Sequence, residues 1–225
     1  MSSVLSGFGR RFREYAALLV YGDLNAIAWR LQVKMRRLDF NFVPENELGV
    51  TGSRANSYSD SGARLRAVLK KIPIEPSSFA LDLGCGKGGA VLVLASRFTR
   101  ADGVDISPSL VAIGRENLRR MGVKNGSLNV RDAAEFTDLD GYHFIYLANP
   151  FPRVVMQEVV ANLMASLSRC PRAIQILYCC PVDGDLFEAR GFSRRLECRL
   201  RPLDHPFVSY TWRPEAPSEL CEPRQ

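Results

Sequence analysis

The sequence predicts an α/β fold: a doubly wound, mostly parallel seven-strand sheet with an antiparallel C-terminal hairpin and an N-terminal helical extension. Three observations predict this fold. Short apolar runs alternate with helical segments between residues 79 and 190, the last two apolar runs follow one another without a helix, and a glycine-rich turn follows the first run. Strands that alternate with helices form parallel sheets covered on both faces, with right-handed crossovers.

The first 40 residues predict the helical extension. Apolar residues recur there at helical spacing in two runs: Phe8, Phe12, Tyr15, Leu18 and Leu19, then Ile27, Leu31 and Met35. Gly22-Asp23 offers a break between the runs, and Arg30, Lys34 and Arg37 lie on another face of the second. Two interpretations stay open. The helix either presents a basic amphipathic surface to anionic lipid or nucleic acid, or packs on the domain and exposes an ordinary basic face.

The rest of the chain predicts its elements in order. Residues 41–62 are polar and rich in turn-forming residues, which predicts a lead-in loop or lid, and residues 63–71 predict a short helix. Strands are then expected at 79–83, 101–105, 127–131, 142–147 and 173–180, and helices at 89–97, 108–121, 154–167 and 185–190. Two alternating segments at 192–201 and 207–213, joined by a proline-rich turn, predict the antiparallel hairpin.

The first predicted strand runs into Leu-Asp-Leu-Gly-Cys-Gly-Lys-Gly-Gly at residues 81–89. Glycines let the backbone turn sharply and let a ligand approach more closely than a Cβ would allow. Gly84, Gly86 and Gly89 also satisfy the Gly-x-Gly-x-x-Gly pattern of dinucleotide sites. Lys87 is expected to face solvent at the start of the helix. The loop therefore predicts a nucleotide-type ligand.

An acid ends each of the first three predicted strands. Asp82 precedes the glycines, where a carboxylate suits a cationic or amine-bearing ligand and would repel a pyrophosphate. Asp105 closes the second strand, where an acid can accept hydrogen bonds from ribose hydroxyls. Its alternative role as a helix N-cap is better met by Ser107. Asp132 ends the third strand, where it can meet an adenine amino group, although acids are also common in such loops.

These motifs resemble those of the class I S-adenosylmethionine-dependent methyltransferases, the seven-strand Rossmann-like family. The glycine motif, Gly-Val-Asp-Ile-Ser-Pro-Ser-Leu at 103–110 and Arg-Asp-Ala-Ala-Glu-Phe at 131–136 agree with it in order and spacing, over residues 60–213. The resemblance is nearest to small bacterial members with an Asn-Pro-Phe fourth motif and a lead-in like Gly-Val-Thr-Gly at 49–52. It implies S-adenosyl-L-methionine as the cofactor.

Carried over by position, the resemblance implies a set of cofactor-binding residues: Asp82, Gly84, Cys85, Gly86, Gly88, Asp105, Ile106, Asp132 and Ala133, with Tyr58 and Asp60 as lid contacts. Asp82 would lie near the methionine amino end of the cofactor and Asp105 would hold the ribose. Ile106 would pack on the adenine, and Asp132 with Ala133 would meet its edge.

Asn149, Pro150 and Phe151 are the candidate catalytic residues, which would position the methyl acceptor. In relatives with an Asn-Pro-Pro-aromatic motif, the asparagine side chain and a proline carbonyl bind the amino group that is methylated. This chain has one proline fewer before the aromatic residue, so the acceptor stays open. Methyl transfer to a nitrogen acceptor is the predicted function, and a plain strand-ending turn is the alternative role of this motif.

Two other functions remain open. An NAD(P)-dependent oxidoreductase would explain the glycines, but it leaves Asp82 unexplained and no Tyr-x-x-x-Lys-like catalytic pair is found. A non-catalytic cofactor-binding protein would present its basic ends to lipid or nucleic acid.

The net charge of +6 belongs to the two ends of the chain. Residues 41–189 carry 16 charges of each sign, whereas 1–40 and 190–213 each have a basic surplus, so an anionic partner is expected there. The 6 cysteines lack Cys-x-x-Cys spacing, which predicts reduced thiols, no metal site and a cytoplasmic protein. The apolar run between Glu14 and Asp23 is too short for a signal peptide or a membrane span.

The chain is therefore expected to divide into four parts: a helical extension at 1–40, a lead-in loop or lid at 41–62, a Rossmann-like methyltransferase domain at 63–213 and a tail at 214–225.

Overall fold

The computed structural model describes residues 24–50, 54–74, 79–201 and 204–214. Several predicted features lie outside these residues. They are the first apolar helical run with its Gly22-Asp23 break, the segment weighed as a signal peptide, Thr51-Gly52 of the lead-in motif, Cys221 and almost all of the tail.

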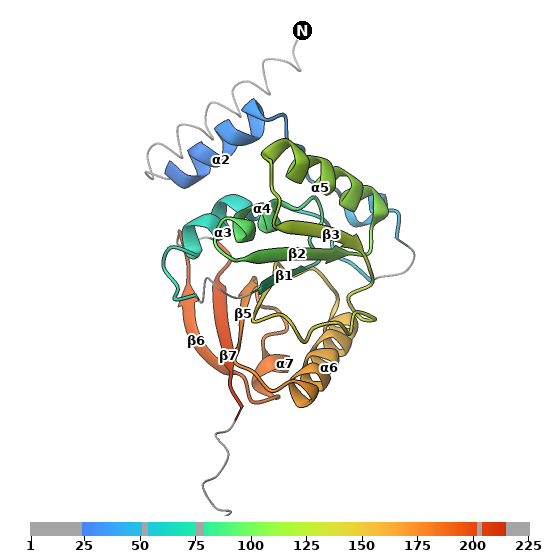
Figure 1. The fold of residues 1–225 in the computed structure, drawn as a ribbon, viewed down its shortest axis with the longest axis vertical. Helices are drawn as coiled ribbons and strands as arrows, with labels where there is room; N and C mark the ends of the chain where they lie inside the picture. Colours follow the sequence, from blue (N-terminus) through green and yellow to red (C-terminus); the bar gives the residue numbers. More distant parts are fainter. Residues whose placement is uncertain (1–23, 51–53, 75–78, 202–203, 215–225) are drawn as a thin grey trace, which may run out of the picture.

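A seven-stranded sheet forms the centre of the molecule, in the order β3-β2-β1-β4-β5-β7-β6 (Figure 1). Its strands are β1 (Phe79–Leu83), β2 (Arg100–Asp105), β3 (Gly126–Val130), β4 (Phe144–Leu147), β5 (Ile174–Cys179), β6 (Ser193–Cys198) and β7 (Phe207–Trp212). The first five strands are parallel to one another, and β7 runs antiparallel to both β5 and β6. The predicted sheet and its C-terminal hairpin are confirmed.

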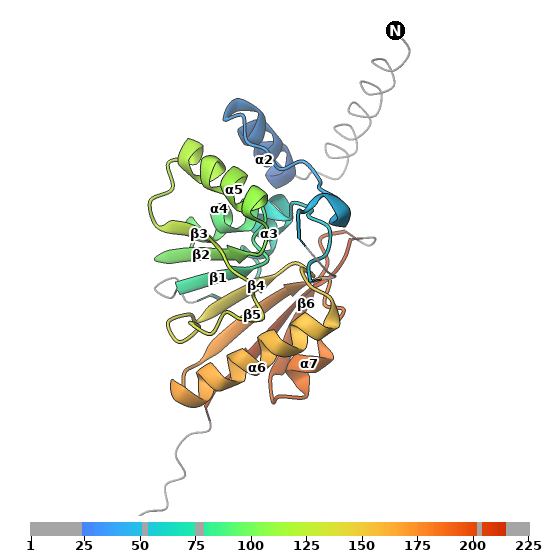
Figure 2. The same cartoon turned by 90° about the vertical axis from the view of Figure 1, so that its right-hand side faces the viewer.

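Helices cover both faces of the sheet, as Figure 2 shows. The helical elements are α2 (Leu24–Met35), η1 (Glu45–Glu47), α3 (Gly62–Val68), α4 (Gly89–Ala95), α5 (Pro108–Met121), α6 (Arg153–Arg169) and α7 (Asp185–Glu188). One core lies between the sheet and α3, α4 and α5, and the other lies between the sheet and α6 and α7. Neighbouring strand residues alternate between them: Ala80 belongs to the first core and Leu81 to the second.

Most predicted boundaries hold to within one or two residues, and the differences have local causes. Helix α5 matches its predicted range because Pro108 begins it and Gly122, with a φ of 69°, ends it. Ser107 occupies the N-cap position, but its hydroxyl donates to the carbonyl of Leu48 instead of capping the helix. Strand β5 stops before Cys180, whose φ of 56° takes it out of the extended conformation. Strand β4 begins at Phe144 rather than at residue 142, because the backbone N–H of Tyr142 closes a turn by donating to the carbonyl of Leu139, and its hydroxyl donates to Asp102.

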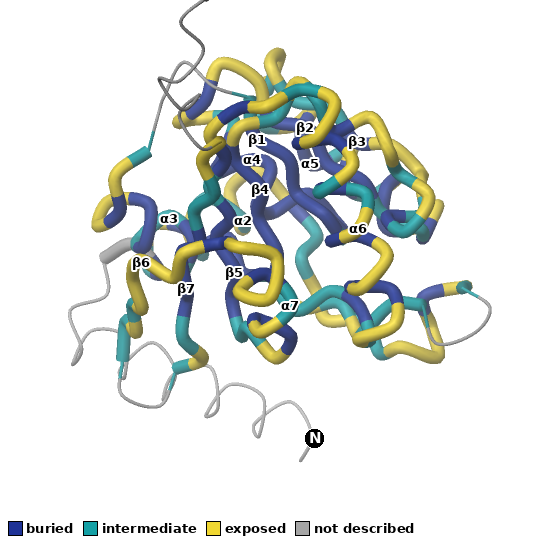
Figure 3. The backbone as a smooth tube through the Cα atoms, turned by 90° about the horizontal axis from the view of Figure 1, so that it is seen from below, coloured by how far each residue is buried: buried dark blue, intermediate teal, exposed yellow. Residues whose placement is uncertain are grey.

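Burial follows the layered arrangement (Figure 3). All four residues of β4 are buried, as are four of the five residues of β1, whereas β6 at the sheet edge is exposed along almost its whole length. The strands β1, β2 and β4 are parallel neighbours near the middle of the sheet, so their carboxyl ends lie side by side at one edge. Ligands of doubly wound sheets bind at such a position.

Helix α2 packs on the domain through Trp29, which is 5% exposed and belongs to the first core. Its ring stacks on Phe40 with the centroids 5.5 Å apart. The interpretation of a helix packed on the domain is confirmed for this part of the chain, while Leu31 and Met35 remain exposed on its outer face. No helix among the described residues is long and apolar enough to cross a membrane.

Candidate functional site

The glycine loop between β1 and α4 is a tight turn held to the neighbouring strand. The backbone N–H groups of Gly84 and Cys85 both donate to the carbonyl of Val104 in β2, at 2.9 and 3.0 Å. Gly84 and Gly88 have φ values of 81° and 77°, which only glycine adopts at little cost. The loop therefore needs its glycines for its own conformation.

Asp82 is buried beside this loop without a partner. It lies in β1 between Gly103 of β2 and Tyr146 of β4, and it is 2% exposed. Within the described part of the chain, no side chain or backbone N–H donates to its carboxylate. Burial raises the pKa of Asp82 well above its usual value, and the nearby charges of Asp105 and Asp60 raise it further. An unpaired buried carboxylate is costly, and a cationic or amine-bearing ligand would offset that cost.

Asp105 links the end of β2 to the glycine loop. Its Oδ2 accepts from the N–H of Gly86 at 2.8 Å, and its Oδ1 accepts from the N–H of Ser107 at 2.8 Å. Burial raises the pKa of Asp105, although these two hydrogen bonds act in the opposite direction. Each oxygen keeps a lone pair for a hydroxyl group of a ligand.

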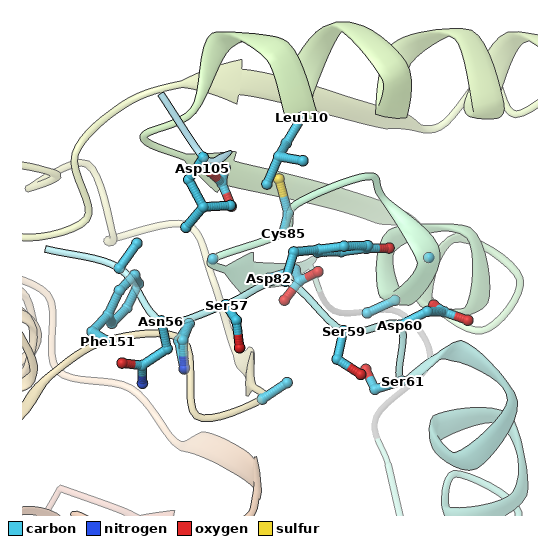
Figure 4. Close-up of a pocket in the computed structure, with 18 of the residues that line it drawn as sticks. Asn56, Ser57, Ser59, Asp60, Ser61, Asp82, Cys85, Asp105, Leu110 and Phe151 are labelled. Atoms are coloured by element: carbon cyan, nitrogen blue, oxygen red, sulfur yellow. The ribbon is translucent and has the colours of Figure 1, made fainter. Parts of the chain in front are cut away.

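A cleft lies between these acids and the residues that precede α3 (Figure 4). Nine of the predicted site residues line it: Tyr58, Asp60, Asp82, Gly84, Cys85, Asp105, Ile106, Pro150 and Phe151. In Figure 4, the segment that carries Asn56, Ser57, Ser59 and Asp60 runs alongside Asp82 and Cys85. Two acids of the sheet edge and a polar loop thus face one another.

The other predicted residues lie close to the cleft but do not line it. Gly86 is covered by the ring of Tyr58, and Gly88 faces Leu118 and Leu128 behind the loop. Ala133 is buried in the second core.

Asp132 is held by an arginine from the lead-in loop. Its Oδ2 accepts from Nε of Arg54 at 2.7 Å and lies 2.6 Å from Nη2 of the same guanidinium. Its Oδ1 accepts from the backbone N–H of Ala134 at 2.9 Å. The acid that was expected at the adenine edge is therefore engaged by a basic side chain in this structure.

The turn after β4 holds Asn149 in an unusual conformation. Its φ is 51°, in the left-handed region that few non-glycine residues adopt. Its carbonyl accepts from Nδ2 of Asn56 at 2.9 Å, and the next carbonyl, of Pro150, accepts from the backbone N–H of Asn56 at 2.9 Å. The side-chain Oδ1 lies 3.5 Å from the hydroxyl of Tyr178 at the end of β5. Strained residues of this kind collect at functional sites.

The expectation that Lys87 faces solvent is wrong. Lys87 is 3% exposed, and its Nζ contacts Oδ1 of Asp39 at 2.9 Å and the carbonyl of Asn41 at 3.0 Å. Burial alone would raise the pKa of Asp39, but the hydrogen bonds from Asn41 and Lys87 outweigh it and lower that pKa. The glycine loop is thus tied from behind to the segment after α2.

Sequence reasoning missed two further polar residues of the cleft, Asn56 and Ser61. The hydroxyl of Tyr146 donates to Ser61 at 2.8 Å, next to Asp82. Nothing in the local sequence pattern marks either residue, because their partners lie 85 and 93 positions away.

Comparisons with known proteins agree with this geometry. Residues 80–172 match the family described as a methyltransferase domain. A trans-aconitate 2-methyltransferase of Methylobacterium radiotolerans is 33% identical over 92 residues, which are 40% of this chain and 34% of that protein. A 23S rRNA (uracil(1939)-C(5))-methyltransferase of Alkalilimnicola ehrlichii is 29% identical over 173 residues, covering 70% of this chain and 37% of that protein. The chain thus spans about a third of the length of these relatives.

Solved structures share the fold at low identity. An S-adenosylmethionine-dependent methyltransferase from Aquifex aeolicus superposes with a TM-score of 0.53 at 16% identity, covering 68% of this chain and 93% of that one. A Pyrococcus abyssi tRNA (uracil-54, C5)-methyltransferase in complex with S-adenosyl-L-homocysteine gives 0.50 at 17% identity, covering 69% and 38%. Residues 80–172 therefore match a methyltransferase domain, and the chain shares the fold of solved S-adenosylmethionine-dependent methyltransferases.

Proposed function

We propose that the protein transfers a methyl group from S-adenosyl-L-methionine to a nitrogen acceptor by in-line displacement. The observation that carries the cofactor assignment is the pair of acids beside the glycine loop, the buried Asp82 and the partly buried Asp105. The amino group of a zwitterionic cofactor would suit the unpaired carboxylate of Asp82. Its ribose would suit the carboxylate of Asp105, which is already oriented by the glycine loop.

The cofactor would lie along the carboxyl edge of β1, β2 and β3. Asp82 would accept from the methionine amino group, with the backbone of residues 84–88 and Cys85 beneath it. Asp105 would accept from the ribose hydroxyls and Ile106 would pack on the adenine. Asp132 and Ala133 would contact the adenine edge. For this, Arg54 would have to release Asp132 or bind it together with the adenine.

Tyr58 supports the same placement as a lid contact. Its hydroxyl is fully buried and has no hydrogen-bond partner among the residues that the structure describes. The side chain lines the cleft, so a shift of its ring toward a bound ligand would give the hydroxyl a partner.

The protein's contribution to the reaction is orientation and the exclusion of water, because the bound cofactor supplies the activated methyl group. Asn149, Pro150 and Phe151 would hold the acceptor in line with that methyl group. The amide of Asn149, close to the hydroxyl of Tyr178, offers both a donor and an acceptor to a nitrogen with a free lone pair. Phe151, 6% exposed, would shield the reacting atoms from water.

The class of acceptor molecule is a separate question. The basic surplus at both ends of the chain supports an anionic partner such as nucleic acid or lipid, and some relatives are named as RNA methyltransferases. The free thiols of the described cysteines support a cytoplasmic location. The alternative of an NAD(P)-dependent oxidoreductase is not favoured, because the family match is to a methyltransferase domain.

Two measurements test the proposal. Calorimetry should show binding of S-adenosyl-L-methionine and none of NAD; the reverse result would remove the cofactor assignment. Transfer of a labelled methyl group into separated protein, RNA, lipid and small-molecule pools of a lysate should label one pool. Hydrolysis of that product should release an N-methyl compound, and a C-methyl product would refute the nitrogen acceptor.

A further inference from the structure

Residues 54–60 cross the carboxyl edge of the sheet, and we call this segment the strap. Alternate side chains of the strap each contact a different part of that edge: Arg54 the loop after β3, Asn56 the turn after β4, Tyr58 the glycine loop and Asp60 the start of α4. The intervening Ser57 and Ser59 are exposed. Such alternation is typical of an extended segment that lies along a surface. On the side away from the sheet edge, the backbone of Tyr58 forms an antiparallel bridge with Val43.

The strap fills the space that two glycines leave open. A Cβ at Gly86 would lie 2.2 Å from Cδ2 of Tyr58, and a Cβ at Gly89 would lie 2.1 Å from Oδ1 of Asp60. Glycines in such a loop allow a ligand to approach the backbone. Here the chain's own side chains make that approach, while the buried hydroxyl of Tyr58 stays without a partner.

The space that remains is small. The cleft has a free volume of about 50 Å³, which holds a few water molecules. Pockets for small organic ligands are several times larger, roughly 300–1,000 Å³. A nucleoside-sized ligand therefore cannot enter while the strap lies as described.

Polar contacts at the Arg54 end tie the strap to the loops after β3 and β4, whereas the other end is held by Asp60, which accepts from Trp29 and Gly62. Arg54 forms the ion pair with Asp132, and these side chains are 37% and 16% exposed. Asn56 donates twice, to the consecutive carbonyls of Asn149 and Pro150. Water can replace part of each of these contacts when the segment lifts.

We propose that the strap is a gate that Arg54 and Asn56 hold shut, and that it must lift before the cofactor can enter. This inference rests on the proposed cofactor. When a ligand binds only the open form, its association is slowed in proportion to the fraction of molecules that are open. Loss of either anchor therefore accelerates association. Lifting the strap also frees the carbonyls of Asn149 and Pro150, so the gate acts on the acceptor side as well.

Stopped-flow fluorescence with S-adenosyl-L-homocysteine tests the gate. The indole N–H of Trp29 donates to Asp60 in the strap at 2.9 Å, and Trp212→Phe leaves Trp29 as the single tryptophan reporter. In that background, Arg54→Ala and Asn56→Ala should each raise the association rate constant about tenfold. Arg131→Ala is the matched control, because it removes an exposed positive charge beside Asp132 without breaking the ion pair, and it should leave the rate unchanged.

The outcomes separate the gate from the proposed cofactor. Unchanged association rates in both anchor variants, with binding intact, would overturn the gate and leave the cofactor assignment standing. If the parent and an Arg54→Ala/Asn56→Ala double variant both fail to bind, the cofactor assignment fails and the gate fails with it. Binding by the double variant alone supports the gate. Thermal melting checks folding, and Arg54→Lys, expected to give an intermediate rate, replaces any variant that does not fold.

Discussion

The substitution Asp82→Asn should weaken cofactor binding and at the same time stabilise the empty protein. Asparagine has nearly the same shape, so the packing between Gly103 and Tyr146 is kept and the change removes mainly the charge. In the empty protein that charge is buried at 2% exposure without a donor. In the complex we expect it to meet the amino group of the cofactor.

The two effects have different sizes. Loss of a hydrogen bond between charged groups costs about 1.5–3 kcal/mol, which weakens the affinity for S-adenosyl-L-methionine roughly 10- to 100-fold. Removal of the unpaired charge should raise the free energy of unfolding by about 1 kcal/mol, or about 2–4 °C in Tm for a chain of this size. Burial raises the pKa of Asp82 in the folded protein above its unfolded value of 3.8. Ionisation therefore destabilises the native state as the pH rises from the unfolded pKa toward the folded pKa. The stability gain of the variant should therefore be present at neutral pH and vanish toward acid.

Asp102→Asn is the matched control. Asp102 is also 2% exposed and lies on the neighbouring strand β2, but it pairs with Arg100 and accepts from Tyr142 and Ser127. This variant should lose about 2–3 kcal/mol of stability and keep its cofactor affinity. Calorimetry and thermal melting of both variants complete the test. Equal affinities for Asp82→Asn and the parent protein would refute the role of Asp82, and a lower Tm would refute the claim that its charge is unpaired.

Lowering the pH through the raised pKa of Asp82 should weaken cofactor binding, because protonation of the carboxylate removes its negative charge. Calorimetry of Asp82→Asn over the same pH series should lack this dependence. Asn149→Ala should lower labelled-methyl transfer roughly 10- to 100-fold with little change in cofactor affinity, and should lose about 1 kcal/mol because alanine strains at a φ of 51°. Asn149→Gly separates these effects: melting should show its stability kept, while transfer stays as low as in the alanine variant. Lys87→Met should lower the free energy of unfolding by about 2 kcal/mol in a denaturant titration, and an unchanged midpoint would argue against the buried ion pair with Asp39.

The sheet and the glycine loop were predictable because their signals are local. An apolar run, a glycine turn and a helical repeat can each be read within about ten residues. The approach of Asp82 to Asp105 was also predictable, because parallel strands end at the same edge of a sheet. The charge of Asp105 raises the pKa of Asp82, in agreement with this proximity.

The contacts of the lead-in loop could not be predicted in the same way. Arg54 and Asp132 are 78 positions apart, and Asn56 and Asn149 are 93 apart. A polar loop has no periodicity that fixes where it will lie, since its position depends on tertiary contacts. The burial of Lys87 was missed for the same reason, because its partner Asp39 belongs to a segment 48 positions earlier in the chain.

The buried ammonium of Lys87 makes the matched domain depend on the residues that precede it. A shortened chain that began at residue 63 would contain all of the matched methyltransferase domain, yet it would lack both Asp39 and the carbonyl of Asn41. It would also lose Trp29, which is 5% exposed and belongs to the first core. An ammonium without acceptors inside the protein is costly enough to pull the glycine loop open toward water. The smallest unit able to keep the cofactor loop in shape therefore reaches back at least to α2.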